Sequence, residues 1–139
     1  NQIVIGFSAP SLGSDSRFAC QLIASMLGGS ASSRLFRRLR EEQGLVYSVD
    51  ACASSYLSAG VFTVSMGVSR ESEKKAVLTA AEVLHEFPDT VTEEELDLAR
   101  DHYLSGLIMS LESNSARAAR YGTGELLLGG AISEKEHEE

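Results

Sequence analysis

A chain of 139 residues with a hydrophobic content of 43% is long enough to bury a sizeable core, and we expect one domain over residues 1–139. Its 12 basic and 20 acidic residues give a net charge of −8, which argues against nucleic-acid binding because that function needs a basic face. No apolar run approaches the roughly 18 residues of a membrane span. We therefore expect a globular domain with no nucleic-acid partner and no membrane span.

The start of the chain predicts a strand followed by a helix. Ile3–Phe7 is a short apolar run of the kind found in buried strands. Ser14 or Asp15 can cap the helix that follows, and Gly28 and Gly29 end it. Because glycine tolerates the left-handed conformation of a helix C-cap, we expect that conformation at this glycine pair.

A short basic helix comes next. Ser32 or Ser33 offers an N-cap oxygen, and Gly44 ends the helix. The helix carries four arginines, which are Arg34, Arg37, Arg38 and Arg40.

Two strands follow, at 46–55 and 61–68, and the short segment between them predicts an antiparallel hairpin. Leu45, Tyr47 and Val49 alternate with other residues, so we expect these three side chains on one face of the first strand. The second strand alternates clearly, with Phe62, Val64, Met66 and Val68 on one face.

The rest of the chain predicts helices. Ser69 can cap a helix over 70–87, which Pro88 ends, and Thr92 with Glu95 forms a capping box before a long helical region. Strands and helices are segregated along the chain. The predicted fold class is therefore α+β, an antiparallel sheet with helices packed mainly on one face.

Histidine is the limiting residue for metal chemistry in this chain. The three histidines are His85, His102 and His137. A zinc motif His-Glu-x-x-His, or the inverted motif His-x-x-Glu-His, needs two histidines one helical turn apart. Asp89 stands where the motif from His85 needs its second histidine, and Ser133 stands where the inverted motif ending at His137 needs its first. We expect all three histidines at the surface or an interface, and no metal ligands on this chain.

The basic helix and the tyrosine after it allow two interpretations each. The arginines can bind carboxylates or peptide carbonyls, or they can form a solvated face with ion pairs to Glu41 and Glu42. The pattern around Tyr47 is typical of a tyrosine at the core edge with a hydrogen-bonded hydroxyl.

The two cysteines, Cys20 and Cys52, have no metal-type spacing. We expect two small buried apolar residues in a reducing compartment. A disulfide between them is the alternative, and sequence alone cannot test their pairing.

Two motifs carry a family resemblance. Residues 27–36 read LGGxxxSRLF and residues 39–48 read LRExxGLxYS, with further matches at 94–96 and 110–129. The chain closely resembles the C-terminal half of the pitrilysin/insulinase family of zinc metallopeptidases, which includes the mitochondrial processing peptidases. Since that half normally runs further, the resemblance implies a chain truncated at its C-terminus.

The resemblance implies specific roles for Arg40 and Tyr47. In this family two homologous halves enclose a chamber, and the N-terminal half carries the zinc motif. The C-terminal half contributes an arginine and a tyrosine seven residues apart. Arg40 is expected to hold backbone carbonyls of the substrate, and Tyr47 to donate a hydrogen bond to the oxyanion. The other three arginines keep their solvated-surface interpretation.

The implied function is a zinc-dependent endopeptidase that cleaves unfolded peptides or presequences, with zinc in the N-terminal half and this chain inactive alone. Its expected partners are that half or a homologous subunit, a peptide substrate, and a second copy paired through strand edges. The expected compartment is the bacterial cytoplasm, with the mitochondrial matrix as the alternative. The alternative functions are a non-catalytic scaffold or recognition subunit of the same fold, and an unrelated α+β interaction domain.

Overall fold

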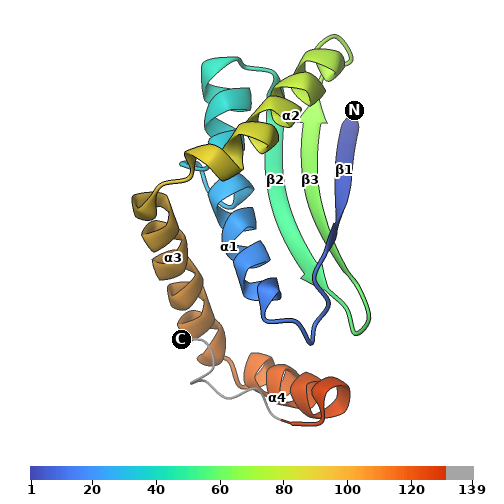
Figure 1. Ribbon diagram of the computed structural model, residues 1–139, viewed down its shortest axis with the longest axis vertical. Helices are drawn as coiled ribbons and strands as arrows, with labels where there is room; N and C mark the ends of the chain where they lie inside the picture. Colours follow the sequence, from blue (N-terminus) through green and yellow to red (C-terminus); the bar gives the residue numbers. More distant parts are fainter. Residues whose placement is uncertain (131–139) are drawn as a thin grey trace. The chain divides into compact units, whose positions relative to one another are not determined.

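The computed structural model describes residues 1–130. The first compact unit is Asn1–Arg100, and the second begins at Asp101. The elements in chain order are β1 (Gln2–Ala9), α1 (Ser16–Gly28), the π-helix η1 (Phe36–Glu42), β2 (Val46–Ser55), β3 (Gly60–Val68), α2 (Glu73–Thr90), α3 (Glu93–Leu111) and α4 (Asn114–Leu128) (Figure 1). The prediction of one domain over residues 1–139 stays a prediction.

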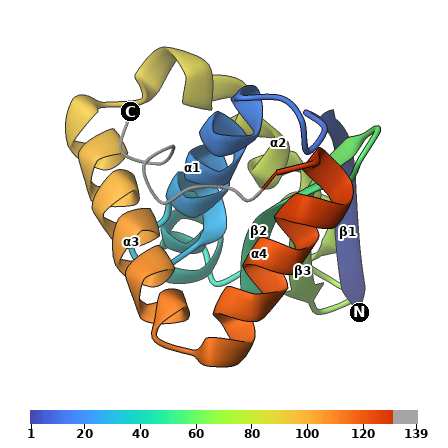
Figure 2. The ribbon, with the colours of Figure 1, turned by 90° about the horizontal axis from the view of Figure 1, so that it is seen from below.

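The sheet of the first unit has three antiparallel strands in the order β1-β3-β2. The β2–β3 hairpin begins and ends within one residue of the prediction. Helices α1, η1 and α2 lie on the same side of the sheet, as Figures 1 and 2 show. We call the other side the open face, because Val4, Ser48, Asp50 and Cys52 are exposed there. The structure confirms the predicted α+β class.

The core lies between the sheet and these helices. Every second residue of β3 is buried, as the alternation predicts: Phe62, Val64, Met66 and Val68. The helices contribute mainly small and branched side chains, because helix and sheet approach closely. The buried helical residues of the core cluster are Ala24, Leu27, Leu35, Leu39, Ala76, Ala80, Val83 and Phe87.

Strand β2 departs from the predicted alternation at its start. Val46 pairs with Val68 and Ser48 with Gly67, so Tyr47 is the extra residue of a β-bulge. Val46 is buried, whereas Tyr47 is 71% exposed and lies on the open face. The expectation of Tyr47 at the core edge was wrong, because a bulge places two successive side chains on one face and reverses the alternation before it.

The glycine pair after α1 serves close packing rather than a left-handed cap. Gly29 has φ −80°, in the right-handed region. A Cβ on Gly28 would lie 2.3 Å from the backbone nitrogen of Ala51, so only glycine lets the end of α1 reach β2. The left-handed conformation occurs instead at Gly44, with φ 61°, where η1 ends.

Helix α2 runs to Thr90 instead of ending at Pro88. One proline in a last turn removes a single backbone donor, and the turn still closes because the amide of Val91 donates to the carbonyl of Phe87. The predicted capping box is confirmed: the amide of Thr92 donates to Glu95, and the amide of Glu95 donates to Oγ1 of Thr92. This box begins α3.

In the second unit, α4 begins at a side-chain cap and ends at a glycine. The amide of Ala116 donates to Oγ of Ser113, and Gly129 has φ 71°. Within residues 1–130, no helix combines the length and apolar character needed to cross a membrane.

Candidate functional site

The short helix η1 positions the candidate site. Leu35 and Leu39 are fully buried beneath it, so their burial fixes the segment against the core. At its end the amide of Gly44 donates to the carbonyl of Arg40, and the amide of Leu45 donates to the carbonyl of Leu39. A π-helix is rare and is frequently found at functional sites. This one delivers the chain directly into the bulge of β2.

Arg40 and Tyr47 are both presented to solvent. Arg40 is exposed, and its guanidinium carbon lies 5.2 Å from the ring centroid of Phe36. Tyr47 is exposed on the open face, and no residue in the described part of the chain bonds to its hydroxyl. The expectation of a hydrogen-bonded hydroxyl was therefore wrong. No hydrogen bond or ion pair joins Arg40 to Tyr47 within residues 1–130.

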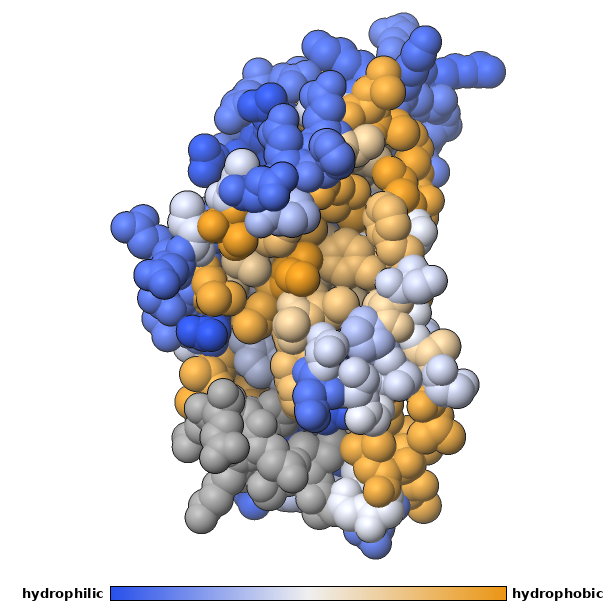
Figure 3. Space-filling view, viewed as in Figure 1, coloured by the Kyte–Doolittle hydropathy of each residue, from blue (hydrophilic) through white to orange (hydrophobic). Residues whose placement is uncertain are grey.

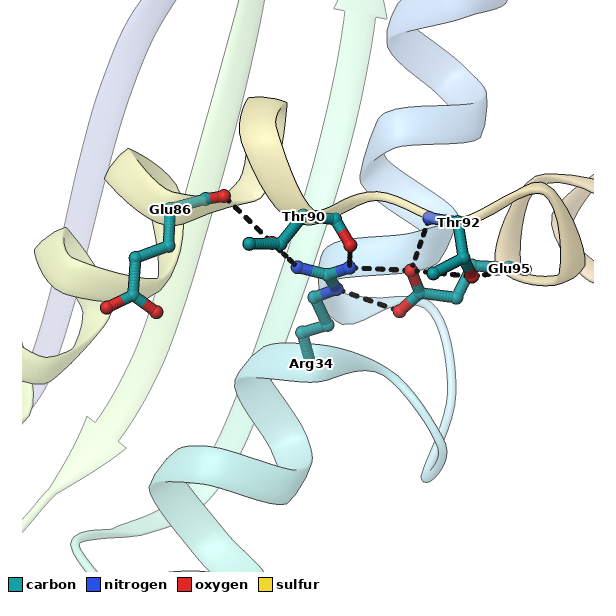
Figure 4. Close-up of polar contacts among 5 residues, drawn as sticks. All are labelled: Arg34, Glu86, Thr90, Thr92 and Glu95. Atoms are coloured by element: carbon teal, nitrogen blue, oxygen red, sulfur yellow. Dashed lines mark hydrogen bonds and ion pairs between the residues drawn. The ribbon is translucent and has the colours of Figure 1, made fainter.

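Arg34 connects its own helical segment to the ends of α2 and α3, and we call this set of contacts the joint. Its Nε and Nη2 donate to the two carboxylate oxygens of Glu95 at 2.8 and 2.6 Å (Figure 4). Its Nη2 also donates to the carbonyl of Thr90 at 2.6 Å, and its Nη1 donates to the hydroxyl of Thr90. The guanidinium carbon lies 5.1 Å from the ring centroid of Phe87. The interpretation of Arg34 as a solvated surface residue was wrong, because the ends of α2 and α3 supply acceptors for four hydrogen bonds from its guanidinium.

The electrostatics of the joint favour the ion pair. The hydrogen bond from Arg34 is the main cause that lowers the pKa of Glu95 from 4.5 to about 2. The same bond raises the pKa of Arg34 above its ordinary value. Both groups are therefore charged at neutral pH. The sequence shows Glu95 as a capping residue, but nothing in it signals a partner 61 residues earlier in the chain.

The other two arginines line an open groove beside the joint. Its volume is about 280 Å³, and it is lined by Arg34, Arg37, Arg38, Glu42, Val83, Glu86 and Glu95. Arg38 lies 3.6 Å from Glu42, as expected for a solvated face. Three arginines face three glutamates, so the groove has no strong net charge. Hydrophilic side chains cover this end of the first unit, whereas apolar ones gather over α1 (Figure 3).

The structure gives no support for a metal centre on this chain. Within residues 1–130, no three histidine, cysteine, aspartate or glutamate side chains group closely enough to hold a metal ion. His85 and His102 are exposed, and His137 and Ser133 lie outside the described residues. The described residues therefore do not fit zinc.

The cysteines are both free. Cys20 is half-buried, whereas Cys52 is exposed on the open face, so the expectation that both are buried was wrong. The reason is the alternation of β2, which turns even-numbered residues after the bulge outward.

The family of the chain follows from its sequence. Residues 1–103 match the family described as the peptidase M16 inactive domain. The chain belongs to the peptidase M16 family. It is 34% identical over 128 residues to an uncharacterized zinc protease of Bacillus subtilis, and the match covers 91% of this chain and 31% of that protein. The M16 chain thus spans about a third of the length of the curated relatives it matches.

Solved structures share the fold of this M16 chain. A peptidase M16 inactive domain from Pseudomonas fluorescens superposes with a TM-score of 0.70 at 22% identity, covering 74% of this chain and 26% of that one. A chain of complex III2 from Candida albicans superposes with a TM-score of 0.86 at 17% identity, covering 97% of this chain and 34% of that one. The recognised family and its α+β fold are both confirmed.

Proposed function

We propose that this chain is the C-terminal half of a zinc-dependent endopeptidase that cleaves unfolded peptides or presequences inside an enclosed chamber. The proposal is carried by one observation, the 71% exposure of Tyr47. A tyrosine that folding alone selects usually buries its ring and bonds its hydroxyl. The bulge of β2 instead turns this phenol away from the core, which suits a group that meets a substrate.

The proposed role of Tyr47 is to donate a hydrogen bond from its hydroxyl to the oxygen of the scissile carbonyl as negative charge develops there. Such a donor acts mainly in the transition state, so it raises kcat more than it lowers KM. Its hydroxyl has no competing partner in the described part of the chain. The group is therefore ready to donate without breaking an internal bond.

The proposed role of Arg40 is to bind backbone carbonyls of the peptide on either side of the cleaved bond. A guanidinium carries five donors in a planar fork, which suits several carbonyls along an extended peptide. Its stacking on Phe36 limits the directions in which that fork points. Loss of Arg40 is therefore expected to raise KM.

The zinc is proposed to lie in a partner N-terminal half, since relatives are named zinc proteases and the described residues of this chain do not fit the metal. When bound there, zinc supplies an activated water for hydrolysis. Its own N-terminal half or a homologous subunit is the proposed partner. The bacterial cytoplasm is the proposed compartment, with the mitochondrial matrix as the alternative.

The second candidate function is a non-catalytic scaffold or recognition subunit of the same fold. The likeness to a chain of complex III2 favours considering it, because that protein is not named as a protease. This function predicts a partner without a complete zinc motif. It also predicts normal assembly function when Arg40 or Tyr47 is replaced.

The deciding experiment measures peptide cleavage by this chain mixed with its zinc-binding N-terminal half, with and without a zinc chelator. Wild type is compared with Tyr47→Phe and with Tyr56→Phe, a matched control because Tyr56 is 63% exposed. We expect no cleavage by this chain alone and chelator-sensitive cleavage by the mixture. Tyr47→Phe should lower kcat by about 10²-fold or more, while Tyr56→Phe should not change it.

Two outcomes would contradict the proposal. Unchanged kcat in Tyr47→Phe removes Tyr47 from the mechanism. No cleavage by a folded complex, verified by gel filtration and circular dichroism, favours the scaffold function.

A further inference from the structure

The bulge at the start of β2 decides which face of the sheet Tyr47 occupies. Val46 and Ser48 pair with successive residues of β3, so Tyr47 and Ser48 together oppose the single residue Gly67. In a regular strand counted back from the inward-facing Val49, Tyr47 would point to the core side. The bulge adds one residue, and as a result Val46 is 6% exposed and Tyr47 is 71% exposed.

A side chain on the residue opposite the bulge would meet the hydroxyl of Ser48. A Cβ on Gly67 would lie 2.7 Å from Oγ of Ser48 and 3.8 Å from Oε1 of Gln2. The first distance is shorter than non-bonded atoms tolerate, so the side-chain hydroxyl of Ser48 must turn away to admit the Cβ, whereas the backbone nitrogen of Ser48 at 3.8 Å is at an ordinary contact distance. The φ of Gly67 lies outside the left-handed region, so the backbone conformation does not demand glycine. Space beside Ser48 is the remaining physical reason for glycine in the interior of this strand.

We propose that Gly67 and Ser48 are positioning residues for Tyr47. Together they hold the bulge in a shape that keeps the phenol on the open face, and neither needs to touch the substrate. The inference rests on the proposed function of Tyr47. It goes further by assigning the placement of that group to a pair of residues on two neighbouring strands.

The test introduces a valine side chain opposite the bulge. The comparison is a valine placed two residues away, on the same face of the same strand. Gly67→Val places a β-branched residue against Ser48. Ser65→Val is the matched control, because Ser65 lies on the same strand and face and pairs in regular register with Asp50 and Val4. Both variants are assayed for peptide cleavage in the complex with the zinc-binding half.

We expect Gly67→Val to lower kcat by about 10- to 100-fold, because a displacement of about 1 Å at a catalytic group has an effect of that size. KM should stay within about twofold, since a donor to the oxyanion contributes little to ground-state binding. Ser65→Val should change neither constant by more than about twofold. A smaller loss is expected in Gly67→Ala, and Ser48→Ala in that background should restore kcat because it removes the crowded Oγ.

A second readout in the same complex reports the position of Tyr47 without using activity. N-acetylimidazole acetylates exposed tyrosine hydroxyls, and mass spectrometry gives the ratio of labelling at Tyr47 to that at Tyr56. Tyr56 is an internal reference because it is 63% exposed and lies outside the bulge. The ratio should fall severalfold in Gly67→Val and stay at the wild-type value in Ser65→Val.

The two readouts separate failure of the inference from failure of the proposed function. An unchanged labelling ratio in Gly67→Val overturns the inference, whatever happens to cleavage. A lowered ratio with unchanged kcat supports the positioning of Tyr47 by this pair and overturns the catalytic role of Tyr47. A lowered ratio with lowered kcat, both restored by Ser48→Ala in the Gly67→Ala background, supports both.

Discussion

Arg34 and Arg40 lie six residues apart on one short helical segment, yet their surroundings differ completely. Arg34 is bonded to Glu95 and Thr90 and stacks on Phe87, so its donors are directed at the protein itself. Arg40 is exposed, and among the ion pairs and cation–ring contacts within residues 1–130 it takes part only in the one with the ring of Phe36.

The difference teaches that the partners of a charged residue, rather than its type, decide what it does. A guanidinium whose donors are satisfied by the fold contributes to stability and has little left for a ligand. A guanidinium whose donors face solvent contributes little to the free energy of unfolding and can bind a peptide. We therefore expect substitutions at Arg34 to change stability and substitutions at Arg40 to change catalysis.

Of the two arginines, the larger effect on catalysis is expected at Arg40. Arg40→Gln removes the charge and most donors, so kcat/KM for peptide cleavage should fall about 10- to 100-fold, chiefly through KM. The free energy of unfolding should change by less than about 0.5 kcal/mol, since the side chain is exposed. Steady-state kinetics and urea denaturation measure the two quantities.

Arg37→Gln is the matched control for this prediction, because Arg37 is an exposed arginine on the same helix. It should leave both quantities unchanged. An equal loss of kcat/KM in Arg37→Gln would mean that general basic charge, and not Arg40 itself, binds the substrate.

At Arg34 the effect should appear in stability. Arg34→Gln breaks the bidentate pair and leaves Glu95 without its main partner, so we expect a loss of about 2 kcal/mol in the free energy of unfolding. Urea denaturation of this chain measures it. Because the joint acts through the fold, kcat/KM of the folded complex should stay within about threefold. A loss below 0.5 kcal/mol would show that Arg34 is solvated after all.

The pH dependence of the joint follows from Glu95. Its pKa is lowered in the folded chain from 4.5 to about 2 by the hydrogen bond from Arg34. A group with a depressed folded pKa contributes stability above its unfolded pKa and loses it as pH falls. The stability difference between wild type and Glu95→Gln should therefore be full at pH 7 and shrink between about pH 4.5 and pH 2. A difference that stays constant over that window would contradict the ion pair.

Much of the first unit could be predicted because the residue pattern within each element agrees there with the contacts that the element makes in the fold. The strand β3 has a strict two-residue alternation, and its inward residues are all buried. The capping box at Thr92 and Glu95 needs only local contacts, so its sequence pattern is sufficient. Residue spacing within one element is therefore a dependable guide to that element.

The candidate site was harder to predict because it depends on contacts between elements. The alternation of Leu45, Tyr47 and Val49 indicated one shared face, but a bulge opposite Gly67 turns Tyr47 outward. No pattern within β2 reports a crowded contact with β3. The pairing of Arg34 likewise depends on an acceptor from α3, and the family resemblance, rather than spacing, singled out Arg40.

The smallest effect is expected at Phe36, and it tests whether the exposed arginine is held in place. Phe36→Leu removes the ring over which the Arg40 guanidinium lies at 5.2 Å. A cation–π contact at an exposed site is worth about 0.5–1 kcal/mol, so kcat/KM should fall about two- to fivefold. Phe36→Tyr keeps the ring and should keep the wild-type value. Tyrosine preserves the ring face of Phe36 but adds a hydroxyl. If both variants lose kcat/KM equally, the space filled by the Phe36 side chain matters and the stacking of the guanidinium on the ring does not.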